Sequence, residues 1–382
     1  MKDPKYRILQ VVAKKPVGGV GTFLMNSYLD NENFIFDVIE SSENYEGSFN
    51  EFFINRGAKI FLFPEVNSRN FKIYWKKCEK FYHKYHEIYD IVHVHSPSIA
   101  LPHLYHAQKY GIKVRIYHSH NTRYSDSFLK SLRNKALVDI SLKYANTFFS
   151  CGLLAGEKIF KSKNFKIIPN GVPLDNFRFK YDVREKIRKH YNIPEDIYLV
   201  GIVGSVNKIK NQKFILEVAK KVLNNKKILF FVIGDGNLRE QLENDAIEQN
   251  VSNVKFLGRK ENVSSFYNAM DCLVIPSLFE GFPLVSVEAQ ANGLPIVAAD
   301  TIDKTIKLTN QVFFLPIKGN TAIMEWANKI QLLQRNVSLN ISSRVSNLKD
   351  IEGSGYSIKD SSDTLFLNYQ QCIDFYCGKD KL

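Results

Sequence analysis

The chain has 382 residues, of which 45% are hydrophobic and 24% are charged. This length is too great for one ordinary core and suits two domains, and the composition excludes a largely disordered chain. The polar start predicts no secretory signal, and no window approaches the roughly 18 uninterrupted apolar residues of a membrane span. Five cysteines, an odd number without a metal-type CxxC pair, indicate reduced thiols in a cytoplasmic protein.

The net charge of +13 is unevenly distributed along the sequence. Residues 1–190 contain 31 Lys and Arg against 18 Asp and Glu, whereas residues 191–382 contain 21 of each. A basic half favours an anionic partner, which could be membrane lipid, nucleic acid or a phosphate-bearing substrate. A generally lysine-rich proteome would explain the sign of the charge better than its asymmetry.

Short apolar, β-branched runs alternate with longer helix-compatible stretches along the chain. Because strands that are apolar on both faces and separated by helices form parallel sheets covered on both sides, we predict two doubly wound α/β domains. The predicted strands of the first half are RILQVVA, KIFLF, DIVHVH, KVRIYHSH, NTFFSC and FKIIPNG. Those of the second half are YLVGIVGS, KILFFVIG, VKFLGR, CLVIPS and LPIVAA.

The joint between the two domains is predicted near residues 172–196, which contain no buried-strand run and carry two prolines. We therefore predict an N-terminal domain over 1–180 and a C-terminal domain over 190–358. A helix over 359–382 is predicted to cross back to the N-terminal domain.

A glycine-rich turn, KKPVGGVGTFLMNSYL, follows the first predicted strand and opens a helix. Its glycines allow close backbone approach and the helix start offers unpaired N–H groups to an anion, although a plain tight βα turn is an equal alternative. The turn is not the GxGxxG of dinucleotide-binding proteins, because Leu24 stands in it and Asp37 and Glu40 follow no clear second strand. The pattern therefore does not support a nucleotide-dependent oxidoreductase.

Six of the nine histidines lie between residues 93 and 120. Alternation places His93 and His95 on one face of their strand, and His118 and His120 on one face of theirs. Polar residues at the carboxyl ends of parallel strands are where open α/β sheets bind ligands, so we favour His120, and after it His118, as ligand contacts. No carboxylate or cysteine joins them at ligand-like spacing, which argues against a metal site. A structural hydrogen-bonding role is an equal alternative for each histidine alone.

Three glycine turns follow predicted strands of the second half. Gly204 ends the first of these strands, and Lys210 lies just before an amphipathic helix. A diphosphate would be drawn to that lysine and to the helix N-terminus, although a solvated surface lysine is the alternative if the segment stands alone. The other turns contain Gly234 and, after VKFL, Gly258 and Arg259. Together the three turns predict a nucleotide crevice at one sheet edge.

The segment IPSLFEGFPLVSVEAQANGLPIVAAD carries two glutamates eight residues apart. Pro283 and Gly293 predict a helix over about 283–292, so Glu280 precedes the helix and Glu288 lies within it. Two helical residues at this spacing would be about 12 Å apart along the axis and about 80° around it, so they are not a close acid–base dyad. They suit an extended ligand with a carboxylate at each end, because an ionised carboxylate accepts hydrogen bonds from adjacent sugar hydroxyls.

These motifs together resemble those of the retaining family-four glycosyltransferases, which have the GT-B fold of two Rossmann-like domains facing a central cleft. The resemblance covers nearly the whole chain and rests on GGVG, HSHNT, IPNGV, VGSVNKIKNQ, GDGNLR, VKFLGR and the specific E-x7-E block. It implies a cytosolic nucleotide-sugar donor, commonly UDP-linked, and retention of the anomeric configuration. HSHNT and DTIDKTIKLTNQVFFL are most similar to the bacterial capsule and exopolysaccharide branch.

The resemblance also implies roles for individual residues. Glu280, facing the donor sugar, and His120, near the transferred sugar, are the predicted catalytic positions. His118 and Asn121 are predicted on the acceptor side. Glu288 resembles the ribose-binding residue. The predicted donor-binding set is Gly19, Gly204, Lys210, Gly234, Arg259, Gly281, Phe282, Pro283, Leu284 and Glu288.

Two positions depart from the family pattern. Ser205 stands where an arginine usually follows the glycine, and Thr305 stands where a glutamate is usual. A residue such as Arg259 could replace the missing cation. These departures leave open a catalytically degenerate partner subunit as the alternative function.

The chain contains no Asp-x-Asp, the acidic pair that holds a divalent ion in the other large glycosyltransferase class. We therefore predict a metal-independent enzyme without cofactor, in which Lys210, helix N-termini and glycine-loop amides meet the charge of the leaving nucleotide. The predicted partners are a nucleotide-sugar donor and a glycan or lipid-linked glycan acceptor. A nucleic-acid-binding protein is the weaker alternative, because no recognised nucleic-acid module is present.

The segment FKIYWKKCEKFYHKYHEIYD has aromatic residues at helical spacing and lysines over much of the remainder. One interpretation is an ordinary surface helix packed on the first sheet. The other is a helix at an anionic membrane surface, with aromatic residues at the interface, which would place the enzyme peripherally on the inner face of the cell membrane. The lysines concerned are Lys72, Lys76, Lys77, Lys80 and Lys84.

Overall fold

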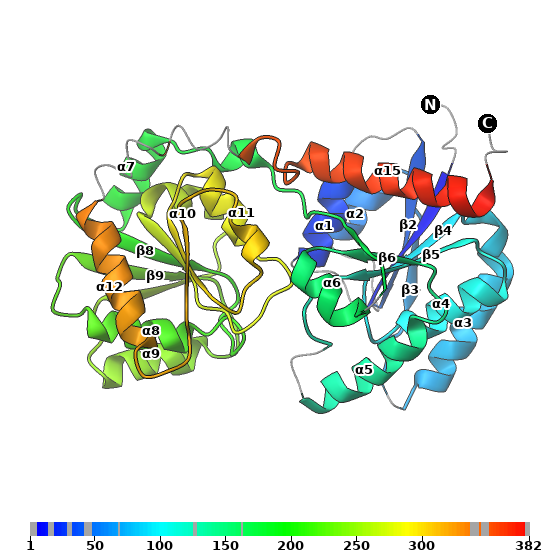
Figure 1. Cartoon of the computed structure of the whole chain (residues 1–382), viewed down its shortest axis with the longest axis horizontal. Coiled ribbons are helices and arrows are strands. Elements are labelled where there is room, and N and C mark those ends of the chain that lie inside the picture. The colour runs from blue at the N-terminus through cyan, green and yellow to red at the C-terminus, as the bar shows by residue number, and fades with distance from the viewer. Residues whose placement is uncertain are drawn as a thin grey trace. The chain divides into compact units, whose positions relative to one another are not determined.

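The computed structural model describes residues 6–13, 19–28, 33–41, 48–67, 69–124, 128–161, 163–336, 344 and 351–378. The chain divides into two compact units, which Figure 1 shows: unit 1 comprises 1–171 and 358–382, and unit 2 comprises 172–357. Residues 172–180, predicted in the first domain, thus belong to unit 2. Unit 1 carries 28 Lys and Arg against 19 Asp and Glu, and unit 2 carries 24 against 20. The basic excess is therefore shared, at +9 and +4, and is not confined to one unit.

Unit 1 is built on a parallel sheet whose strand order, within the described residues, is β3-β2-β1-β4-β5-β6-β7. Its strands are β1 (Tyr6–Val12), β2 (Phe34–Ser41), β3 (Ile60–Phe63), β4 (Ile91–Val94), β5 (Val114–Ser119), β6 (Thr147–Ser150) and β7 (Lys166–Ile167). Its helices are α1 (Gly19–Ser27), α2 (Ser48–Ile54), α3 (Phe71–Tyr85), the 3-10 turn η1 (His86–Ile88), α4 (Ala100–Lys109), α5 (Phe128–Ser141), α6 (Leu153–Phe160) and α15 (Ile358–Cys377).

Both faces of this sheet are covered. Successive residues of a strand point to opposite faces, so each strand contributes apolar side chains to two cores. Ile8 of β1 packs in a core shared with α1, α2 and α15, whereas Leu9 packs in a core shared with α3, α4 and α5. Figure 1 shows these two groups of helices on opposite sides of the sheet. The C-terminal helix α15 therefore completes the first core, where Phe366 stacks on Phe34 of β2 with ring centroids 5.0 Å apart.

Two strand predictions in unit 1 need correction. A clear strand, β2, contains Asp37 and Glu40, and the sequence prediction missed it. Both acids are buried and bonded: Asp37 pairs with Arg7 at 2.8 Å, and Glu40 accepts a hydrogen bond from Asn50 at 2.9 Å. Conversely, the strand predicted in FKIIPNG is only the two-residue β7, which lies at the edge of the sheet and has both residues exposed.

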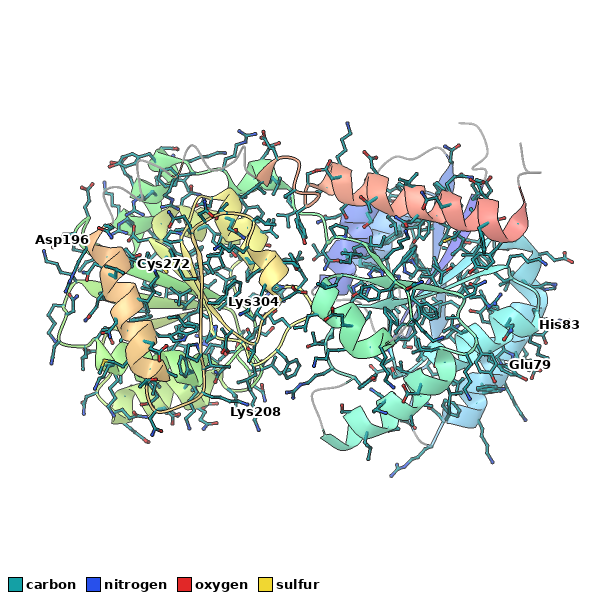
Figure 2. The ribbon with its side chains drawn as sticks, in the orientation of Figure 1. Glu79, His83, Asp196, Lys208, Cys272 and Lys304 are labelled. Carbon is teal, nitrogen blue, oxygen red and sulfur yellow. The ribbon has the colours of Figure 1, made fainter. Side chains whose placement is uncertain are left out.

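The aromatic face of α3 is part of the second core. Tyr74, Cys78, Phe81 and Tyr82 are buried, and the hydroxyls of both tyrosines bond to His103 of α4. The interpretation as a helix packed on the sheet is therefore confirmed, and these buried aromatic residues cannot insert at a membrane interface. The five lysines remain exposed, on a helix whose outer side also carries Glu79 and His83 (Figure 2). Across the part of the chain that the structure describes, no helix combines the length and the apolar character needed to span a bilayer.

Unit 2 is built on a second parallel sheet, in the order β10-β9-β8-β11-β12-β13 within the described residues. Its strands are β8 (Tyr198–Val203), β9 (Ile228–Ile233), β10 (Val254–Gly258), β11 (Cys272–Ile275), β12 (Ile296–Ala299) and β13 (Val312–Leu315), of which β13 was not predicted. Its helices are η2 (Leu174–Phe177), α7 (Tyr181–His190), α8 (Gln212–Lys221), α9 (Arg239–Glu248), α10 (Val263–Ala269), α11 (Leu284–Ala291), η3 (Lys304–Ile306) and α12 (Ala322–Arg335).

Buried ion pairs explain why α7 belongs to unit 2. Arg184 and Arg188 of α7 contact Asp271, at the start of β11, at 2.7 and 3.2 Å. All three side chains are nearly inaccessible to solvent, and separating such a pair would leave an uncompensated buried charge. The interior of this unit also holds Cys272 (Figure 2), and none of the five cysteines, all within the described ranges, forms a disulfide.

In both sheets the strand order reverses beside the first strand, between β1 and β4 in unit 1 and between β8 and β11 in unit 2. Ligands of open α/β sheets bind at such a switch point, beyond the carboxyl ends of the strands. The loops that follow β8 and β11 contain Lys210 and Glu280, so the fold places two predicted donor residues at this point.

Candidate active site

Lys210 and Glu280 form an ion pair at the switch point of unit 2. The Lys210 Nζ lies 2.7 Å from one Glu280 carboxylate oxygen, and the Ser277 hydroxyl donates to the other at 2.6 Å. The lysine and glutamate side chains are 24% and 11% exposed, so solvent screens their attraction only partly. Glu280 is therefore held by two donors before any ligand binds.

The loop between β8 and α8 is shaped around Lys210. The Asn207 side chain accepts hydrogen bonds from the backbone N–H groups of Ile209 and Lys210, each at 3.0 Å. Asn211, which precedes α8, has a left-handed backbone and donates to the Pro276 carbonyl at the end of β11. These contacts fix the base of the lysine side chain beside the Glu280 loop.

The three predicted glycine turns meet backbone to backbone. Gly204 and Gly234 have φ angles of +141° and +140°, and a Cβ on Gly234 would collide with the Gly204 carbonyl oxygen. Hydrogen bonds join the turns, from Val206 N–H to the Asp235 carbonyl at 3.0 Å and from Gly234 N–H to the Gly258 carbonyl at 2.9 Å. The turns are thus one packed edge, in which glycine is required for steric reasons.

Arg259 follows this edge and is exposed. Its side chain makes no hydrogen bond or ion pair with the residues that the structure describes. An exposed, uncompensated guanidinium next to Gly258 is consistent with a contact to an anion, but the structure brings it to no other predicted residue.

Glu288 lies on α11, which begins at Leu284, so that Pro283 precedes the helix and is not part of it. The Tyr267 hydroxyl donates to one Glu288 oxygen at 2.6 Å, and the other oxygen has no partner among the described residues. Burial raises the pKa of the Glu288 carboxyl, while the Tyr267 hydrogen bond and the charge of Lys210 oppose that rise. Lys210 therefore acts electrostatically on both glutamates.

The residues between the two glutamates shape the loop and the helix start. Gly281, Phe282 and Pro283 are buried, and Leu284 is half-buried. The Phe282 ring stacks on Tyr356, with centroids 4.8 Å apart. The Phe282 side chain is thus engaged in packing, and this residue could contact a donor only through its backbone.

In unit 1 the four predicted histidines come together at the carboxyl ends of β4 and β5. His95 and His120 are hydrogen-bonded at 2.8 Å, and His93 and His118 at 3.1 Å. Burial lowers the pKa of all four, that of His120 to about 3, so these imidazoles are uncharged near neutral pH. His93, His95 and His118 each bring a ring nitrogen within 4.8 Å of the others, a spacing that a metal ion could use, although the sequence prediction disfavoured one.

The remaining predicted residues of unit 1 are more exposed. Asn121 is exposed, and its carbonyl accepts from the Ser119 hydroxyl at 3.0 Å. Gly19 opens α1, and a Cβ added to it would meet no atom of the described residues within 4 Å. Gly18, in the predicted glycine loop, lies outside the described residues.

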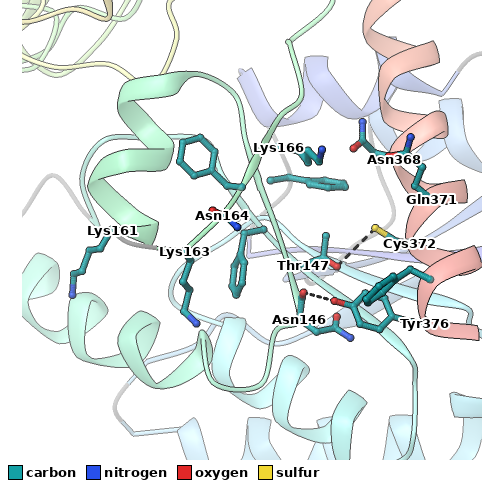
Figure 3. A pocket seen from close by; sticks show the side chains of 14 residues that line it. Asn146, Thr147, Lys161, Lys163, Asn164, Lys166, Asn368, Gln371, Cys372 and Tyr376 are labelled. Atoms are coloured by element: carbon teal, nitrogen blue, oxygen red, sulfur yellow. Dashed lines mark hydrogen bonds between the residues drawn. The ribbon is translucent and has the colours of Figure 1, made fainter.

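A separate cavity of about 1020 Å³ lies in unit 1 between the β6–β7 edge and α15 (Figure 3). Lys161, Lys163 and Lys166 line it, together with Phe375. One side is closed by the Tyr376 hydroxyl, which donates to the Asn146 carbonyl at 2.7 Å. No predicted site residue lines this cavity, so it is distinct from the histidine cluster.

Comparison with known proteins places the chain in a family. Residues 183–333, within unit 2, match the model of the family described as glycosyl transferases group 1. EpsF of Bacillus subtilis, which is named as a glycosyltransferase, is 30% identical over 322 residues, or 80% of this chain and 82% of EpsF. The chain belongs to the group 1 glycosyltransferases.

Further relatives of this group 1 glycosyltransferase agree with the assignment. The UDP-Gal:alpha-D-GlcNAc-diphosphoundecaprenol alpha-1,3-galactosyltransferase of Escherichia coli is 27% identical over 282 residues, covering 70% of this chain and 72% of that enzyme. The crystal structure of Anabaena Alr3699/HepE in complex with UDP superposes with a TM-score of 0.77 at 17% identity, over 96% of this chain and 100% of that one. The predicted family and the predicted GT-B fold are thus confirmed.

The structure shows which hydrogen bonds are made by Ser205 and Thr305, the two residues that depart from the family pattern. Ser205 is exposed, and its carbonyl accepts from the buried Gln212 side chain at 2.9 Å. Thr305 donates through its hydroxyl and its N–H to the Asp303 side chain, at 2.7 and 2.9 Å, and Asp303 thereby caps η3. Of these two bonds, a glutamate at position 305 would keep the one from the backbone N–H and lose the one from the hydroxyl.

Sequence reasoning missed several partners of the predicted residues in this glycosyltransferase. Ser277 and Tyr267, which hold the two glutamates, carry no motif of their own. Gln10 and Tyr369, which bond to the histidines, are 359 residues apart in the chain. Only the resemblance of the neighbouring motifs could have drawn attention to Ser277, and nothing in the sequence pairs Gln10 with Tyr369.

Proposed function

We propose that this glycosyltransferase moves a sugar from a UDP-sugar to a glycan or lipid-linked glycan, with retention of configuration and without a metal ion, in the synthesis of a bacterial surface polysaccharide. The observation that carries the proposal is the Lys210–Glu280 pair at the switch point of unit 2, with Glu288 on the adjoining helix. The UDP bound by HepE and the UDP-Gal named for the E. coli relative support the choice of donor.

The donor is proposed to extend along this edge. Its diphosphate lies against Lys210 and the packed glycine turns, its ribose against the unpartnered Glu288 oxygen, and its sugar against Glu280. The Lys210 ammonium has three N–H donors, so it can keep its contact with Glu280 and still bind a phosphate oxygen. As the glycosidic bond breaks, the growing charge on the nucleotide is stabilised by groups already in place.

Glu280 is proposed to bind sugar hydroxyls and not to attack carbon. Its two oxygens already accept hydrogen bonds from Lys210 and Ser277, and such donors lower the reactivity of a carboxylate nucleophile. We therefore propose departure and attack on the same face of the sugar. Unit 1 is proposed to supply the acceptor side, through His118, His120 and Asn121.

A panel of nucleotides and nucleotide-sugars tests the donor and the metal independence together. UDP at a hundredfold excess over its Kd should stabilise the fold by about 2.7 kcal/mol and raise Tm by roughly 5 °C, while GDP and ADP have smaller effects. Hydrolysis of the preferred UDP-sugar should continue in EDTA. If no nucleotide raises Tm, the degenerate-partner alternative is favoured. Loss of activity in EDTA, with recovery on adding manganese, would reject metal independence.

A peripheral contact with anionic membrane is also proposed, and it depends only on the exposed charge of α3. At about 1 kcal/mol per lysine near an anionic surface, five lysines would give attachment that salt weakens. The full chain should co-sediment with phosphatidylglycerol liposomes at low salt and be released at high salt. Changing Lys72, Lys76, Lys77, Lys80 and Lys84 to Glu should abolish binding.

The matched control for this experiment makes the same charge change in unit 2. Five exposed lysines there are available, namely Lys213, Lys220, Lys221, Lys226 and Lys227. Their replacement by Glu should leave most of the binding intact. Equal loss in both variants would show that net charge, and not α3, governs attachment, and no binding by the wild type would end the membrane proposal.

A further inference from the structure

Gln10, Tyr369 and the four histidines form one continuous hydrogen-bonded chain in the interior of unit 1. The order of contacts is His120–His95 at 2.8 Å, His95–Gln10 at 2.8 Å, Gln10–Tyr369 at 3.1 Å, Tyr369–His93 at 2.6 Å and His93–His118 at 3.1 Å. The members come from β1, from the ends of β4 and β5, and from α15. Apart from the half-buried His120, all are at most 4% exposed.

The ring nitrogens at the two ends of this chain are without a partner in the described part of the structure. His120 Nδ1 and His118 Nε2 are both buried and make no hydrogen bond with any residue that the structure describes. The two rings lie side by side, with centroids 4.0 Å apart and 27° between their planes. Buried polar atoms of native proteins are normally hydrogen-bonded, so two such atoms together indicate a ligand or water position.

The orientation of the Gln10 amide determines every proton in the chain. With its NH₂ donating to Tyr369, the amide oxygen must accept from His95 Nε2–H, so His95 Nδ1 accepts from His120 Nε2–H. Tyr369 then donates to His93 Nδ1, and His93 Nε2–H donates to His118 Nδ1. All four neutral rings carry their proton on Nε2, because a neutral imidazole has one donor and one acceptor. The ends are then a bare acceptor at His120 Nδ1 and a donor at His118 Nε2–H.

Rotating the amide by half a turn satisfies the same contacts with every direction reversed. The NH₂ now donates to His95 Nε2, the amide oxygen accepts from Tyr369, and Tyr369 accepts from His93 Nδ1–H. All four rings carry their proton on Nδ1. The ends have exchanged roles, so that His120 Nδ1–H is a donor and His118 Nε2 an acceptor.

We infer that Gln10 and Tyr369 are positioning residues that hold the four histidines in one shared tautomer and thereby set whether His120 donates to, or accepts from, a ligand hydroxyl. The role of the ligand as a sugar or acceptor hydroxyl rests on the proposed function, but the coupling of the tautomers does not. Because burial keeps all four rings neutral near pH 7, the chain can reverse without moving net charge. Because Tyr369 lies on α15, this helix takes part in setting the tautomer of the histidines.

The test is nitrogen NMR of the full chain with ¹⁵N-labelled histidine, which reports the tautomer of each ring directly. In the wild type, His93, His95, His118 and His120 should show one common Nε2–H to Nδ1–H ratio. Tyr369→Phe and Gln10→Met each cut the chain between His95 and His93. In both variants the ratio should stay equal within the His95–His120 pair and within the His93–His118 pair, but differ between the pairs.

Tyr82→Phe is the matched control, because it removes one buried hydroxyl from His103, a histidine outside the chain. It should change the His103 signal and leave the four histidines unaltered. A wild type in which the four ratios differ, or variants in which all four remain equal, would overturn the inference. So would one bound zinc per purified chain, since His93, His95 and His118 would then be ligands.

Measurements of kcat and of UDP binding distinguish a failure of this inference from a failure of the proposed function. Tyr369→Phe should lower kcat about fivefold, the size of one neutral hydrogen bond, and leave UDP binding unchanged. Gln10→Glu is expected to separate the two histidine pairs as Gln10→Met does, because an ionised carboxylate accepts from both His95 and Tyr369 and donates to neither. If UDP fails to bind the wild type, the proposed function is wrong, while the NMR result still decides the coupling.

Discussion

Lys210→Ala is expected to lower kcat about 100-fold or more, because it removes a preorganised cation from the place where charge develops on the leaving nucleotide. Loss of one such donor typically costs about 2.7–4 kcal/mol of transition-state stabilisation. Here the loss is aggravated, since the Glu280 carboxylate, which is only 11% exposed, loses its ion-pair partner beside the proposed position of the diphosphate. Both kcat and UDP affinity should fall, measured by steady-state kinetics and by calorimetric titration with UDP.

Lys208→Ala is the matched control. Lys208 lies two residues earlier in the same loop and is exposed (Figure 2), and it makes no ion pair with the described residues. Its removal should change kcat less than about twofold. Similar losses from Lys208→Ala and Lys210→Ala would mean that the loop contributes only general positive charge.

The double variant Lys210→Ala/Glu280→Gln separates the two parts of the effect. Neutralising Glu280 removes the unpaired carboxylate, so the double variant should bind UDP more tightly than Lys210→Ala alone. Additive losses of UDP affinity would show that the ion pair has no influence on the diphosphate.

Glu288→Ala is expected to weaken UDP binding about 10- to 100-fold, since hydrogen bonds to a charged group contribute about 1.5–3 kcal/mol. KM for the donor should rise by a similar factor, and kcat should change less, because the proposed ribose contact would be made in the ground state and the transition state alike. Glu280→Ala should show the opposite pattern, with turnover reduced more than UDP affinity. Minor, equal effects from both replacements would indicate that the E-x7-E motif is structural.

The pH dependence of UDP binding gives an independent check on Glu288. Burial raises the pKa of its carboxyl and the Tyr267 hydrogen bond lowers it. The ionised form accepts ribose hydroxyl donors, so binding should weaken as the pH falls through this raised pKa. Tyr267→Phe removes the opposing hydrogen bond and should move the weakening to higher pH. A binding curve that does not shift in Tyr267→Phe, while Glu288→Ala abolishes the pH dependence, would contradict this account of Tyr267.

The sequence by itself determined the broad architecture and brought the proposed donor residues of unit 2 to one sheet edge. Apolar runs such as YLVGIVGS and KILFFVIG indicate strands that are buried on both faces. Such strands are typical of a parallel sheet covered by helices on both sides, so the doubly wound folds could be predicted from the local pattern. Lys210, Glu280 and the glycine turns occupy loops at carboxyl ends of those strands, and the chain order of strand, loop and helix is enough to predict that they share one edge.

A strand with buried acidic residues, the boundary between the units and the partners of the site residues could be recognised only from the tertiary structure. The strand β2 has Asp37 and Glu40 among its apolar residues, and their burial is possible only because Arg7 and Asn50, from other elements, compensate them. Residues 172–180 belong to unit 2 because they bond to residues much further along the chain: the Lys180 N–H donates to the Asn268 side chain, and the Phe177 carbonyl accepts from the Asn292 side chain. The aromatic residues of α3 showed a helical face, but the pattern is the same whether a core or a membrane covers it.

The hydrogen-bonded histidine chain shows most clearly what could not be predicted from the sequence. Alternation correctly placed His93 with His95 and His118 with His120, since a strand repeats every two residues. Gln10 and Tyr369, by contrast, meet across 359 residues because α15 returns to pack on the first core. A hydrogen bond depends on distance and direction between atoms, and residues this far apart in sequence acquire both only when the fold brings their backbones together.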